Sequence, residues 1–61
     1  MPNAELKSAI EKSIAAVKAE IAELKQQAKE RMHDRAALFT ITQKLRALNV
    51  RLEELQRNLH Q

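Results

Sequence analysis

The chain has 61 residues, of which 11 are Lys or Arg and 8 are Asp or Glu, so its formal net charge at pH 7 is +3. A chain this short forms at most one small domain, and such domains bury only about 60% of the surface of the unfolded chain. It contains no cysteine, which excludes disulfides and thiolate metal sites. It contains no glycine either, which excludes the glycine-rich loops that hold phosphate groups.

The composition favours helix along almost the whole chain. The only proline is Pro2, and the filler residues are mostly alanine and other strong helix formers. The fold class we expect is therefore all-α. No apolar run is longer than four residues, so we expect neither a transmembrane helix nor a secretory signal. The apolar face of the second half is a narrow row of leucines without tryptophan and with few basic residues, so we expect no contact with a membrane surface. The missing cysteine fits the cytoplasmic location that we expect.

The first half of the chain carries apolar residues in steps of three and four, the spacing of one face of a helix. This pattern predicts a helix over about residues 4–31. We call its apolar residues the first seam. The first seam consists of Leu6, Ile10, Ile14, Val17, Ile21, Leu24 and Ala28.

The second half carries a stricter pattern, in which steps of three and four alternate without a miss, as in a coiled coil. It predicts a second helix over about residues 35–60, and we call its apolar residues the second seam. The second seam consists of Leu38, Ile41, Leu45, Leu48, Leu52, Leu55 and Leu59.

The two seams do not share one register. If the heptad of the first seam continued, polar residues such as Thr42 and Asn49 would occupy core positions of the second half. The break predicts a turn at about residues 32–34, with Asp34 as the N-cap of the second helix and His33 in the left-handed conformation. Residues 1–61 would then form a single antiparallel hairpin. The alternative is one long helix in a parallel coiled coil, which the missing glycine favours and in which Asn49 would be buried.

A single hairpin cannot bury both seams, because two helices touch along one line only. We therefore expect two copies to form a four-helix bundle, or one copy to bind a larger partner through the open seam. The residues assigned to self-association are Ile10, Ile14, Val17, Ile21, Leu24 and all seven residues of the second seam.

The opposite side of the second helix carries the only aromatic residue of the chain, Phe39. Helical geometry places Val50 on the same stripe, with arginines around both residues. This composition is typical of a protein-binding patch. A contact within an oligomer and incidental exposure are the alternatives. The residues assigned to partner binding, which we call the Phe39 surface, are Phe39, Gln43, Arg46, Val50, Arg35 and Arg57.

Catalytic and metal chemistry are not expected. Glu30 and His33 have the Glu-x-x-His spacing of di-iron bundles, but they fall at the turn, and the inward residues of both helices are apolar. Ser8 and Ser13 have no histidine nearby to act as a base. We therefore expect a non-enzymatic protein without a metal or cofactor.

The function expected from the sequence is that of a small homodimeric adaptor or inhibitor, which binds a larger protein through the Phe39 surface. The alternative is RNA binding. The chain resembles small dimeric four-helix bundles such as Rop, in length and expected architecture only, and those bundles bind RNA through one basic helical face. Lys44 and Arg51, one heptad apart on the second helix, are the basic residues available for phosphate groups here.

Overall fold

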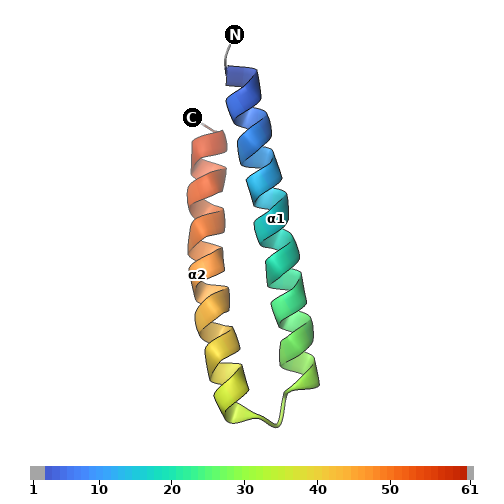
Figure 1. Ribbon diagram of the computed structural model, residues 1–61. Helices are drawn as coiled ribbons and strands as arrows, with labels where there is room; N and C mark the ends of the chain where they lie inside the picture. Colours follow the sequence, from blue (N-terminus) through green and yellow to red (C-terminus); the bar gives the residue numbers. More distant parts are fainter. Residues whose placement is uncertain (1–2, 61) are drawn as a thin grey trace.

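The computed structural model describes residues 3–60, which form a helical hairpin. Helix α1 spans Asn3–Glu30 and helix α2 spans Arg35–Leu59. The two helices run antiparallel and leave both ends of the chain at the same end of the molecule (Figure 1). The prediction of an all-α chain whose two helices pack against each other is confirmed. The second helix starts where predicted, and the other three helix limits differ from the predicted ranges by one residue.

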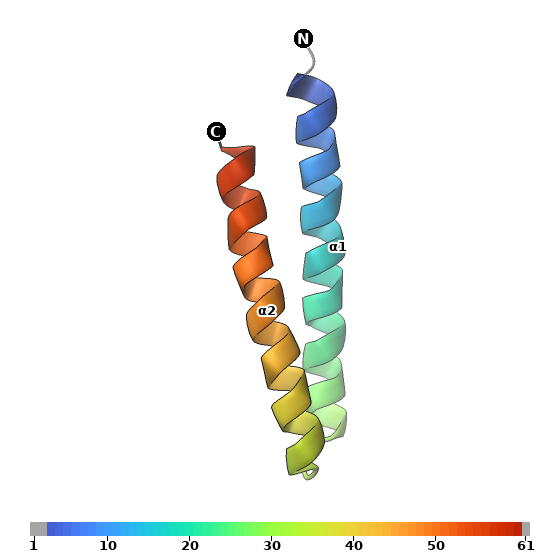
Figure 2. The same ribbon diagram turned by 60° about the vertical axis from the view of Figure 1, so that its left-hand side comes forward.

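The helices lie side by side and are inclined to each other. In the view of Figure 1 the gap between the ribbons is narrowest near the chain ends, and in the view of Figure 2 it is narrowest near the turn. This difference between two views of one structure is expected when the helix axes are inclined to each other. A small inclination is typical of antiparallel helix pairs, because it lets the side-chain ridges of one helix fit the grooves of the other.

The turn between the helices needs no left-handed residue. The amide of Arg31 donates to the carbonyl of Gln27 at 3.0 Å, and the amide of Asp34 donates to the carbonyl of Arg31 at 2.9 Å. No residue in the described range 3–60 has a positive φ, so the prediction that His33 is left-handed is wrong. The chain reverses with Asp34 extended and without a positive φ in the described range, which explains how a hairpin forms without glycine.

Asp34 starts the second helix, as predicted. Its backbone is extended, with φ −105° and ψ 97°, and its side-chain Oδ1 accepts a hydrogen bond from the amide of Ala37 at 3.0 Å. Its carbonyl accepts the first helical bond, from the amide of Leu38 at 2.9 Å. The cap therefore satisfies one of the amides that lack a partner within the helix.

The core of the hairpin is thin. Ile14, Val17 and Ile21 of α1 and Ile41 of α2 are the buried apolar residues. The remaining residues assigned to self-association are only half-buried. These half-buried side chains are Ile10 and Leu24 of α1 and Leu38, Leu45, Leu48, Leu52, Leu55 and Leu59 of α2.

The hairpin exposes more surface than a globular chain of its size. Its accessible area is 5178 Å², whereas a folded monomer of this mass typically exposes about 4,000 Å². Its Cα radius of gyration is 14.5 Å, against roughly 10.5 Å for a compact domain of equal length. Two helices alone therefore leave more surface open to solvent than a compact domain of the same length does.

Leu6 lies where the contact between the two helices ends. It belongs to the first seam by its spacing, but 62% of its surface is exposed. The first turns of α1 extend beyond the end of α2, so no neighbouring helix covers this level (Figure 1).

Replacement of the capping side chain tests the turn. We expect Asp34→Ala to lower the free energy of unfolding by about 1 kcal/mol, because an amide at the start of α2 loses its acceptor. Asp34→Asn should keep most of the stability, since asparagine is an equally good N-cap. Urea unfolding at one fixed protein concentration measures both variants, and equal stability of the alanine variant and the parent chain would contradict the cap.

Candidate functional site

The Phe39 surface lies on the side of α2 that faces away from α1. Phe39 is 67% exposed and Val50 is 55% exposed. Eleven residues separate them, which is about 16 Å along a helix, and their directions around the helix axis differ by only about 20°. Two large apolar side chains thus lie on one solvent-facing stripe without a partner in the hairpin.

Polar and basic side chains accompany this pair. Gln43 and Arg46 lie between Phe39 and Val50 on the same stripe, and both are exposed. Arg57 continues the stripe toward the end of α2, and Arg35 lies at its margin near the turn; these two are exposed as well. Helix geometry brings all six assigned residues to one side of α2, but their role in binding a partner stays a prediction.

A second feature is a depression of about 340 Å³ where the two helices meet. Half-buried Leu24 and Leu48 contribute its apolar part, one from each helix. The other four lining residues are polar or charged. We call this feature the Leu48 groove, and its lining residues are Glu20, Glu23, Leu24, Gln27, Lys44 and Leu48.

The two walls of the Leu48 groove carry opposite charges. Glu20 and Glu23 belong to α1, whereas Lys44 belongs to α2. Arg51 follows Lys44 after seven residues, about 10 Å further along the same flank of α2. The sequence placed Lys44 on a basic face, but sequence alone did not show that two carboxylates of the other helix stand beside it.

The opposite flank of α1 carries a row of lysines that the sequence analysis did not use. Lys7, Lys18 and Lys25 are exposed and lie within about 20° of one another around the helix axis. They flank the first seam on the side away from Glu20. A helical projection of residues 3–30 is sufficient to bring the three lysines together, so the sequence alone identifies this row.

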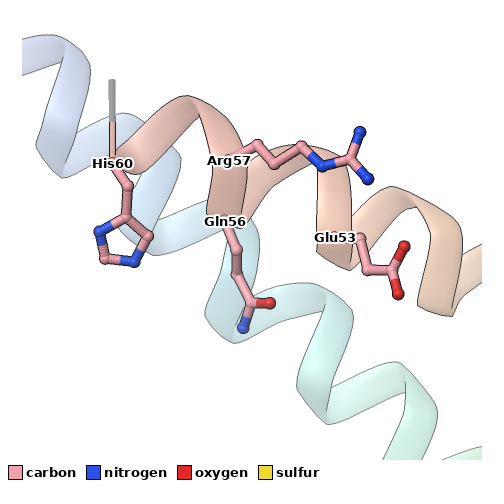
Figure 3. Close-up of a pocket in the computed structure, with 4 residues that line it drawn as sticks. All are labelled: Glu53, Gln56, Arg57 and His60. Carbon is pink, nitrogen blue, oxygen red and sulfur yellow. The ribbon is translucent and has the colours of Figure 1, made fainter.

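The end of α2 has an open depression of about 540 Å³, lined by Glu53, Gln56, Arg57 and His60. Its side chains do not converge. Figure 3 shows Arg57 and Glu53 extending to one side, while Gln56 and His60 project elsewhere. Within residues 3–60, no group of three or more His, Cys, Asp or Glu side chains could hold a metal ion.

Neither helix, as described, is long and apolar enough to cross a membrane. The chain matches no protein-family model, and comparisons with curated proteins and with solved structures found no similar protein.

The exposure of Phe39 predicts that its side chain does not stabilise the hairpin. We expect Phe39→Ala to change the free energy of unfolding by no more than about 0.5 kcal/mol. Ile41→Ala on the same helix is the contrasting variant, with an expected loss of about 2–5 kcal/mol, because it opens a cavity in the core. Thermal unfolding of both variants at equal concentration is the measurement, and a loss of similar size in both would show that Phe39 is packed.

Proposed function

We propose that this protein is a non-enzymatic protein–protein interaction module. Two hairpins associate through their seams into a four-helix bundle, and each copy binds a larger protein through the Phe39 surface. The module acts as a small adaptor or inhibitor. A cytoplasmic location remains part of this proposal.

The half-exposed second seam is the observation that carries the proposal. Of its seven residues only Ile41 is buried, and the six leucines remain half-open to solvent. The excess of exposed area over a typical folded chain is roughly 1,100 Å². A stable protein interface buries about 800 Å² per partner, so the open surface is large enough for one.

The Phe39 surface supports the second part of the proposal. An aromatic side chain with neighbouring arginines is the composition that dominates binding energy in protein interfaces. Phe39 and Val50 stand on a regular helix, so little conformational entropy is lost when they bind. A helix of this kind binds by lying in the groove of a partner. As an inhibitor, the helix would block the groove of its partner. As an adaptor, a dimer would bind one partner through each copy and so join the two partners.

RNA binding is less well supported by the same surfaces. Lys44, one of the two basic residues considered for phosphate contacts, shares the Leu48 groove with Glu20 and Glu23. Carboxylates at that position repel phosphate groups and reduce the electrostatic attraction on which RNA binding depends. For this reason protein binding is the function we propose, and RNA binding is kept as an outcome of the test.

Self-association predicts a mass twice that of the chain. At tens of micromolar we expect sedimentation equilibrium to give a dimer, and the midpoint of thermal unfolding to rise with protein concentration, since association stabilises the folded chain. A stably folded monomer at micromolar concentration, with a midpoint independent of concentration, would refute the bundle.

Partner binding predicts that the proteins retained in an affinity pull-down depend on Phe39. We expect Phe39→Asp to lose the partners retained by the parent chain, because a charge cannot enter an apolar pocket without a large desolvation cost. Met32→Asp is the matched control, since Met32 is 64% exposed but lies in the turn. If the parent chain and the Phe39 variant retain the same proteins, the Phe39 surface is not the binding site. If nuclease treatment removes the retained material, the partner is RNA.

A further inference from the structure

The Leu48 groove has the charge pattern of a surface that fits a second copy of itself. Its α1 wall is acidic, through Glu20 and Glu23, and its α2 wall is basic, through Lys44 and, one heptad further, Arg51. When a twofold axis runs parallel to the helices, α1 of each copy lies against α2 of the other. The acidic wall of each copy then meets the basic wall of its partner.

We propose that the Leu48 groove is the dimer interface and that the two turns of the dimer lie at the same end. This inference rests on the proposed self-association and adds to it which face is used and how the copies are oriented. Half-buried Leu24 and Leu48 form the apolar centre of the interface, and the charged walls surround it. The partner is a second copy of this chain.

The opposite orientation is disfavoured by the same charges. If the turns lay at opposite ends, α1 would pack on α1 and α2 on α2. Glu20 and Glu23 would then meet the same carboxylates of the partner, while Lys44 and Arg51 would meet the same cations. Like charges brought together at an interface repel, so this orientation is selected against.

The opposite face of the hairpin is also disfavoured. There α1 presents Lys7, Lys18 and Lys25, which are all exposed. Helical geometry places Thr42 and Asn49 on the corresponding flank of α2, with Glu53 at its edge. Two copies joined through this face would gather six lysines against four carboxylates, those of Glu11 and Glu53. The lysines would outnumber the acids, whereas the Leu48 groove supplies both signs of charge on facing walls.

Side-chain size along the groove fits the same arrangement. Glu20 and Leu48 line one depression, so they lie at similar levels of the hairpin. The two helices are antiparallel, so seven residues toward the start of α1 and seven residues toward the end of α2 cover the same distance along the hairpin. These steps lead from Glu20 to Ser13 and from Leu48 to Leu55, so Leu55 lies at the level of Ser13. In the proposed dimer, the half-buried Leu55 of each copy meets the small side chains around Ser13 of the other, where a leucine finds room to insert.

The orientation is tested by a distance between the two turns. The chain has no cysteine, so Met32→Cys gives a single spin-label site on an exposed turn residue. Pulsed electron paramagnetic resonance on the labelled dimer should show a distance below about 30 Å, since neighbouring helices of a bundle lie about 8–10 Å apart and the labels add their own length. With the turns at opposite ends, the separation would be roughly 40 Å or more, the length of the helices.

The interface itself is tested by reversing its charges. We expect Glu20→Lys combined with Glu23→Lys to weaken the dimer by at least about tenfold, because twofold symmetry repeats each lost attraction. Adding Lys44→Glu and Arg51→Glu should restore the affinity, since the walls again carry opposite charges. Glu11→Lys combined with Glu53→Lys is the control, because it changes the net charge equally but outside the groove.

The outcomes separate this inference from the function on which it rests. A dimer with a short turn-to-turn distance, weakened only by the groove reversal, supports both. A dimer with a long distance, or one weakened equally by the control pair, overturns the orientation or the interface but leaves self-association intact. A folded monomer in sedimentation overturns the interface and the proposed homodimer together.

Discussion

The line of contact between two helices governs everything else in this structure. A pair of helices can cover only the strip on which each faces the other, so the core reduces to Ile14, Val17, Ile21 and Ile41. The six leucines of the second seam lie beside that strip and stay half-open. A sequence that places a full heptad seam on each helix therefore encodes more apolar surface than one hairpin can bury, and the excess is available for association.

Because the hairpin is so thin, its two flanks and its outer surface differ in composition, and we propose a different role for each. The Leu48 groove combines apolar side chains with opposite charges and suits a symmetric partner. The lysine row on the other flank of α1 keeps that side solvated and discourages assembly through it. In the proposed dimer, the Phe39 surface on the back of α2 stays exposed and available to a different protein. In this proposal, one short chain uses different directions around its helices for self-association and for partner binding.

Much of the fold was predictable because it depends on local chemistry. The apolar spacing predicted both helices, and the register break between the seams predicted the hairpin. Asp34 was identified as the N-cap from its position before Arg35, and its carboxylate accepts the amide hydrogen bond of Ala37. The conformation of His33 was not predicted correctly, because a turn is closed by whichever backbone hydrogen bonds the two packed helices permit, and here none requires a left-handed residue.

The sequence by itself determined the two helices, their seams and the set of side chains on each helix face, because 3.6 residues per turn determine directions within one helix. It also placed Phe39, Gln43, Arg46 and Val50 on one stripe of α2. Only the tertiary structure decided which flank of α1 meets which flank of α2, and hence that Glu20 and Glu23 stand beside Lys44. That pairing follows from how the two helices rotate and shift against each other when they pack, which no pattern within a single helix specifies.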